Sequence, residues 1–92
     1  EEIIFDLLDR FERALGRDLS GHELAKALGR VGYRITRQTG SHLRLSNESA
    51  PQHHVTIPAH DPLKVGTLAG ILGDVSAHLQ ISREELLRRL FD

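Results

Sequence analysis

The chain has 92 residues, of which 39% are hydrophobic and 27% are charged, and its formal net charge is −1. This length suits one domain with a single core between two layers. No run of about 20 apolar residues would span a membrane, and the acidic start does not have the pattern of a secretory signal peptide. The lack of cysteine excludes disulfides and thiolate catalysis and favours a cytoplasmic protein.

Charge is distributed unevenly along the chain. Residues 1–18 carry three arginines against six acids, for −3, and residues 19–64 carry six Lys and Arg against three acids, for +3. Residues 65–92 carry three arginines against four acids, for −1. The basic middle indicates a phosphate-bearing ligand, although the surplus is well below that of a dedicated nucleic-acid binder.

The first predicted element is an amphipathic helix over residues 2–15. Its apolar residues recur at helical spacing: Ile3, Ile4, Leu7, Leu8, Phe11 and Leu15. Gly16 ends the pattern. We expect residues 1–18 to form an N-terminal helical extension and residues 19–92 to form the main domain.

A second helix is predicted to start at Ser20. Glu23 follows three residues later, which is the pattern of a capping box. Leu24, Leu28 and Val31 then share one helical face, and Gly32 closes the helix.

After Gly32 the hydrophobic period changes from helical to alternating, which predicts three strands. Thr39-Gly40 forms a tight turn between the first two, residues 47–52 form a polar loop, and Pro58 ends the third strand. We expect the apolar set to face the helices: Tyr33, Ile35, Leu43, Leu45, Val55 and Ile57. The polar set then shares the open face without an acid: Arg34, Thr36, Gln38, His42, Arg44, His54 and Thr56.

Helical periodicity returns from Gly66 onwards with Leu68, Ile71, Leu72, Val75 and Leu79. Ser82 and Glu85 predict a second capping box before a last helix, whose apolar residues are Leu86, Leu87, Leu90 and Phe91. The element order is α, α-β-β-β-α, α. This order predicts an α+β sandwich, with a three-stranded antiparallel meander covered by helices on one face.

Five motifs over roughly residues 19–80 resemble the HicA toxin family, also called YcfA-like proteins. They are the Ser-Gly helix start at Ser20, the Gly-Tyr strand start at Gly32, Arg-Gln-Thr-Gly-Ser-His at residues 37–42, Val-Thr-Ile-Pro-Ala-His at residues 55–60, and Lys-Val-Gly-Thr-Leu at residues 64–68. Gly-Ser-His alone would mean little. Five motifs in the family's order make the resemblance strong.

The resemblance implies a fold like that of the double-stranded RNA-binding domain. It also implies an RNA-cleaving toxin of a prokaryotic toxin–antitoxin pair, silenced by a HicB-type antitoxin, with catalysis by the histidine that corresponds to His42. No cofactor is expected. The 18 residues before the motifs depart from the family pattern, and they would cover apolar surface or mediate self-association.

The chemistry of the residues agrees with this implication. Imidazole accepts or donates a proton near neutral pH, so His42 suits acid–base catalysis, while Gly40 and Ser41 let the backbone approach a phosphate closely. A turn histidine without a role is the simpler alternative. His54 and His60 are candidates for a second catalytic group. The simpler alternative for His54 is a solvent-exposed residue without a role, and for His60 it is a residue at the strand end that bonds a loop carbonyl.

Phosphate binding is predicted for the arginines near the motif and for the start of the helix after the third strand: Arg34, Arg37, Arg44, Lys64 and Thr67, together with Gly40 and Ser41. Because aromatic residues are scarce, recognition through backbone and shape fits better than base stacking. A zinc site built from His42, His53, His54, His60 and Asp61 is disfavoured, since neighbouring strand residues such as His53 and His54 point to opposite faces.

Taken together, the sequence predicts a metal-independent RNA endonuclease of the HicA type. One alternative is a non-catalytic RNA-binding module of the same fold. Another is an interaction domain that docks a partner through its acidic N-terminal helix.

Overall fold

The computed structural model describes residues 8–10, 12–13, 16–49 and 51–92. Its elements are α2 (Gly21–Leu28), the 3-10 turn η1 (Gly29–Val31), β1 (Tyr33–Thr39), β2 (His42–Asn47), β3 (His53–Pro58), α3 (Val65–Leu79) and α4 (Arg83–Phe91). The α+β class and the predicted order of elements from Ser20 onwards are confirmed. Residues 8–10 and 12–13 are helical, whereas Ile3, Ile4, Leu7, Phe11 and Leu15 of the predicted N-terminal stripe lie outside the described residues.

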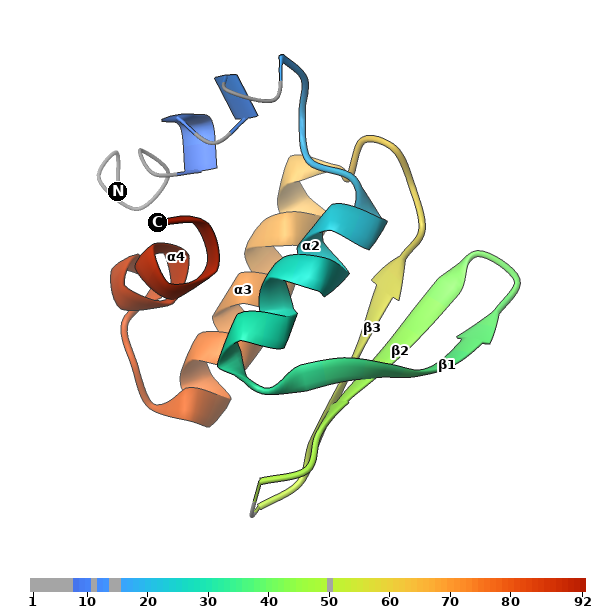
Figure 1. The fold of residues 1–92 in the computed structure, drawn as a ribbon, viewed down its shortest axis with the longest axis vertical. Coiled ribbons are helices and arrows are strands. Elements are labelled where there is room, and N and C mark those ends of the chain that lie inside the picture. The colour runs from blue at the N-terminus through green and yellow to red at the C-terminus, as the bar shows by residue number, and fades with distance from the viewer. Residues whose placement is uncertain (1–7, 11, 14–15, 50) are drawn as a thin grey trace.

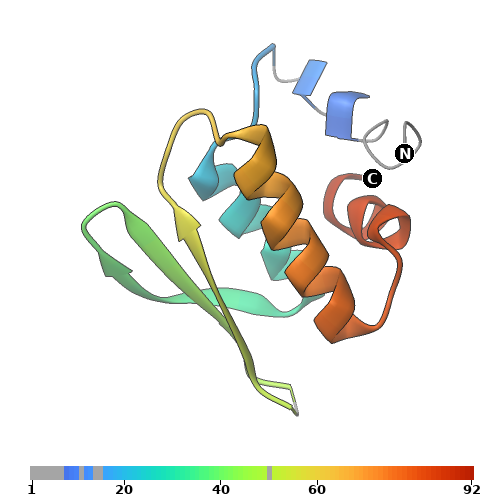
Figure 2. The ribbon, with the colours of Figure 1, turned by 180° about the vertical axis from the view of Figure 1, so that it is seen from behind.

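The domain consists of one sheet with helices packed on one of its faces (Figure 1). The strands are antiparallel in the order β1-β2-β3. Helices α2 and α3 cover one face of this sheet, and α4 packs against them on the side away from the strands (Figures 1 and 2). No described element covers the other face of the sheet, which we call the open face.

The core lies between the sheet and the helices, as the apolar periodicity predicts. The fully buried side chains come from every layer: Leu24 and Leu28, Leu43 and Leu45, Ile57, Leu72 and Val75, and Leu86 and Leu87. Leu8 is also buried in this core, so the described part of the N-terminal segment contacts the domain.

The two predicted capping boxes differ in the structure. Ser20 and Glu23 form both reciprocal hydrogen bonds at the start of α2. At α4, the Ser82 hydroxyl accepts from the Glu85 backbone N–H at 3.0 Å. The Glu85 carboxylate, however, accepts from Arg89 Nε at 3.0 Å and not from the Ser82 backbone N–H. The second box is therefore half formed, because arginines in the last turn compete for the carboxylate.

The predicted alternation along β1 holds as far as Thr36, whose hydroxyl lies 3.2 Å from that of the open-face Ser46, and is wrong beyond it. The pairing with β2 shifts between Ile35 and Arg37, which leaves Thr36 as the extra residue of a β-bulge. Beyond the bulge, Gln38 pairs with Leu43 and is on the helix-facing side rather than on the open face. Arg37 and Thr39 take the open-face positions instead.

The alternation also predicts Ile35 in the core, but its side chain is 48% exposed. It is on the helix-facing side, opposite Leu45. However, β1 is an edge strand, and only its first residue, Tyr33, is buried. Because β1 lies at the edge of the sheet, the core does not enclose Ile35.

Candidate active site

The Gly-Ser-His motif forms the turn of the β1–β2 hairpin and the first residue of β2. Gly40 has φ of +55°, a left-handed conformation that glycine adopts without strain. His42 is exposed and pairs with Thr39 on one side and Pro58 on the other. The imidazole of His42 forms no hydrogen bond with any described residue. It is therefore open to solvent and to a ligand.

The segment after β3 joins this turn to the helix layer. The Ala59 N–H donates to the Ser41 carbonyl at 2.7 Å, and the Gly21 N–H donates to the His60 carbonyl at 2.9 Å. A Cβ on Gly21 would lie 2.0 Å from the Pro58 carbonyl oxygen, so only glycine allows α2 to begin this close to β3. The backbones of Ser41 and His60 are consequently held beside each other.

The open face next to His42 is cationic. Arg34, Arg37 and Arg44 are exposed there, and none of them forms an ion pair with a described residue. Arg37 and Arg44 are direct cross-strand partners. None of the open-face strand positions that the structure describes holds an Asp or a Glu. The three arginines predicted to bind phosphate are thus on one face, and Arg37 is there only because of the bulge.

His54 is on the same face as His42 but is not close to it. It pairs with Ser46, four residues along β2 from His42, which corresponds to about 13 Å at the usual rise of a strand. Its Nδ1 is 2.6 Å from the Ser46 hydroxyl, and that hydroxyl is 3.2 Å from the Thr36 hydroxyl. His42 and His54 therefore cannot act on the same phosphate.

The remaining predicted contacts are in the helix layer. Lys64 is the N-cap residue of α3 and is exposed, and Thr67 follows in the first turn. They do not share the open face with Arg37 and Arg44. Their contact with RNA stays a prediction. It would require an RNA strand that continues from the open face around the end of the sheet to the helices.

The structure brings together a second group of titratable residues that the sequence pattern does not predict. The Tyr33 hydroxyl is 2.7 Å from Nδ1 of His53, whose Nε2 is 3.3 Å from the Asp74 carboxylate. The His78 ring stacks on His53 with centroids 4.2 Å apart. Burial, together with the nearby Asp74 carboxylate, raises the pKa of Tyr33. These contacts connect β1 and β3 to α3 on the helix-facing side of the sheet. We therefore infer that they stabilise the fold and take no part in catalysis.

His53 and His54 point to opposite faces, as expected for neighbouring strand residues. Among the residues that the structure describes, no three His, Asp or Glu side chains converge into a group that would hold a metal ion.

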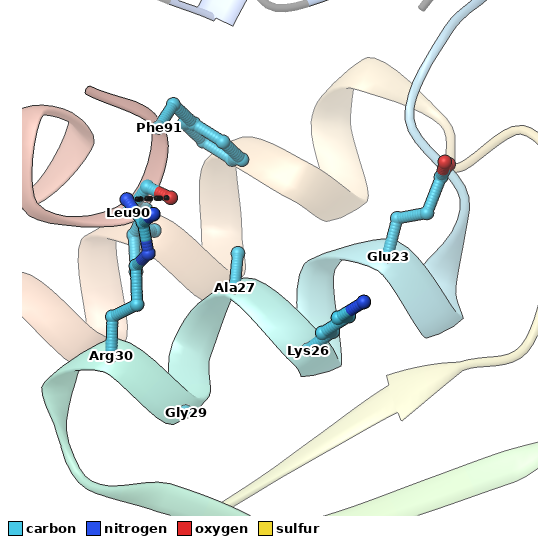
Figure 3. A pocket seen from close by; sticks show the side chains of 7 residues that line it. All are labelled: Glu23, Lys26, Ala27, Gly29, Arg30, Leu90 and Phe91. Atoms are coloured by element: carbon cyan, nitrogen blue, oxygen red, sulfur yellow. Dashed lines mark hydrogen bonds between the residues drawn. The ribbon is translucent and has the colours of Figure 1, made fainter.

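A groove of about 540 Å³ lies between α2 and the end of α4 (Figure 3). It is lined by Glu23, Lys26, Ala27, Gly29, Arg30, Leu90 and Phe91. Arg30 crosses it and donates to the Leu90 and Asp92 carbonyls at 3.4 and 3.2 Å. This groove is on the helix layer and does not include the Gly-Ser-His turn.

These features define a small α+β domain whose open sheet face carries an exposed histidine beside arginines that have no described ion-pair partner. The model of the family described as the HicA toxin of bacterial toxin–antitoxin systems matches residues 21–76. The chain belongs to the HicA toxin family, which confirms the resemblance drawn from its motifs. No curated protein and no solved structure matches the chain.

The matched range covers α2, all three strands and most of α3. It therefore includes every residue predicted for the site, whereas α4 and the residues before Gly21 lie outside it. Membership of the family implies a role as a toxin with a cognate antitoxin. Within the described ranges, no helix is both long enough and apolar enough to cross a membrane.

Proposed function

We propose that this chain is a metal-independent RNA endonuclease, an mRNA interferase, and that His42 is its catalytic residue. The observation that carries the proposal is the exposed His42 imidazole at the end of a face with three arginines and no carboxylate among its described positions. Membership of a toxin family supports the same role.

The proposed reaction uses the nucleophile that RNA already contains. His42 accepts the proton of the 2′-hydroxyl while the 2′-oxygen bonds to phosphorus and the bond from phosphorus to the 5′-oxygen breaks. An acid then protonates the departing 5′-oxygen, which leaves a 2′,3′-cyclic phosphate and a 5′-hydroxyl. The guanidinium groups of Arg37 and Arg44 stabilise the charge that develops on the phosphate oxygens.

His60 is the better of the two secondary candidates for this acid. Its backbone is held beside the Ser41 turn through Ala59 and Gly21, whereas His54 is about 13 Å from His42 along the sheet. We therefore assign the second catalytic role to His60 and not to His54.

The test is cleavage of a fluorescent single-stranded RNA in EDTA by the wild-type protein and by His42→Ala. Positioned acid–base catalysis contributes about 10²–10⁴-fold, so His42→Ala is expected to lose at least about 100-fold in rate while it still binds RNA. Lys26→Gln, which removes an exposed cation from α2, is the control and is expected to cleave normally. Equal cleavage by wild type and His42→Ala would contradict the assignment.

One observation favours the alternative of a non-catalytic RNA-binding module. The His42 ring has no hydrogen-bond partner among the described residues, so nothing in this part of the chain orients it. In that alternative, wild type and His42→Ala both bind RNA and neither cleaves it.

The proposed antitoxin is of the HicB type and covers His42. Because the open face is cationic, we expect acidic and hydroxyl side chains in the part of the antitoxin that contacts it. Replacing Arg44 by glutamate is expected to weaken this complex, which calorimetry would measure, and unchanged affinity would place the antitoxin elsewhere.

A further inference from the structure

The register of the sheet arranges the open-face residues in three rows that run across the strands. The first row is Thr39, His42 and Pro58, the second is Arg37, Arg44 and Thr56, and the third is Arg34, Ser46 and His54. Without the bulge at Thr36, Arg37 would face the helices and the second row would hold a single arginine. The bulge therefore creates the most cationic row.

Each of the last two rows presents groups that bind an anion. In the second row, Arg37 and Arg44 are directly opposite each other, an arrangement that is unfavourable until an anion lies between them. In the third row, Ser46 holds Nδ1 of the His54 ring at 2.6 Å, which leaves Nε2 without a described partner. Arg34 pairs with Ser46 from the other side.

The rows repeat every two residues along β2, at His42, Arg44 and Ser46. Two residues of a strand rise about 6.6 Å, which is comparable to the spacing of successive phosphates in an extended single strand of RNA. All three rows include a residue of β2. Successive phosphates are closer together along one strand of an A-form duplex than along an extended strand, so the match is to unpaired RNA.

We propose that the three rows bind three successive phosphates of one extended RNA strand, with the cleaved phosphate at the first row. This inference rests on the proposed function, since His42 defines the first row. His54 is then a positioning residue two phosphates from the reaction. The open-face strand positions carry no Phe, Tyr or Trp, so recognition at these three phosphates is through the backbone and has little base preference.

The first experiment uses the wild-type protein and a short RNA with 2′-O-methyl groups, which cannot be cleaved. A neutral methylphosphonate replaces one phosphate at a time, and affinity is measured by fluorescence anisotropy. Loss of the contact between one phosphate and its row is expected to weaken binding by up to about fivefold at three consecutive positions and to leave positions further away unchanged. Equal changes at every position would overturn the proposal.

The second experiment assigns the rows. Arg44→Gln and Arg34→Gln are each expected to lower the slope of log affinity against log salt by about 0.7, and Lys26→Gln on α2 serves as the charge-matched control. The methylphosphonate that matches the second row should cost wild type about fivefold and should cost Arg44→Gln less, because only Arg37 then remains beside that phosphate. If the two losses instead add in full, Arg44 does not contact that phosphate.

Two comparisons separate this inference from the proposed function. A duplex of the same RNA is expected to bind more weakly than the single strand, and tighter binding of the duplex would overturn the three-row arrangement. If unmodified RNA is bound with the three-position dependence but is not cleaved, the rows stand and the endonuclease proposal fails. If RNA is cleaved without that dependence, the rows are wrong and the endonuclease proposal stands.

Discussion

Replacement of Gly21 by alanine tests how α2 is joined to the end of β3. The new Cβ would lie 2.0 Å from the Pro58 carbonyl oxygen, 3.0 Å from the Pro58 carbonyl carbon and 3.2 Å from the Ala59 Cα. All three are backbone atoms, so no side-chain rotation relieves the contact. To bring the first distance to an ordinary 3.4 Å, the helix start would have to move by about 1.4 Å.

Such a movement has two costs. Overpacking of this size costs about 1–3 kcal/mol, and the Gly21–His60 hydrogen bond of 2.9 Å, worth about 1 kcal/mol, would be lost. We therefore expect the free energy of unfolding to fall by about 2–4 kcal/mol. The measurement is urea denaturation, in which the midpoint should fall while the slope stays constant.

Gly70→Ala is the matched control. Gly70 is on α3, and beyond the backbone of its own helix nothing lies within 4 Å of the place that a Cβ would take. Alanine there is therefore expected to be neutral or to stabilise by up to about 1 kcal/mol. If Gly21→Ala were as stable as Gly70→Ala, the close approach of α2 to Pro58 would not exist in solution, and the argument that joins the His60 backbone to the Ser41 turn would fail with it.

Three further predictions concern stability. The hydrogen bonds from Arg17, with that from the Ser20 backbone, lower the pKa of Glu23 to about 2 from its ordinary 4.5. This stabilisation is complete above pH 4.5 and is lost as pH falls towards 2, so the wild type should lose more stability over that range than Glu23→Gln, and parallel pH curves would contradict it. Asn47 is buried and its side chain donates to the Val31 carbonyl at 3.2 Å and accepts from the Ser49 N–H at 3.1 Å. Asn47→Ala should cost about 1–3 kcal/mol by urea denaturation, and a neutral result would refute the contact. Ile35→Ala should cost less than about 1 kcal/mol, whereas alanine at the fully buried Ile57 should cost about 2–5 kcal/mol, and equal costs would mean that β1 is covered in solution.

The parts of the fold that depend on neighbours in the chain were predictable from the sequence. Alternating apolar residues define the three strands, and apolar residues at helical spacing define α2 and α3. The Ser20–Glu23 capping box is a contact over three residues, so its formation depends little on the rest of the protein. The family motifs likewise carry their own order and spacing, and they single out His42 without any knowledge of its surroundings.

Tertiary structure alone decided which of these residues meet. Thr36 is an ordinary strand residue in sequence, yet the bulge there moves Arg37 to the open face and Gln38 away from it. The alternation correctly places His42 and His54 on the same face. Only the register shows that His54 pairs with Ser46, four residues along β2 from His42. The reason is physical: local patterns determine which side of a strand a residue faces, whereas pairing between strands, set by the packing of the whole core, determines which residue is its neighbour.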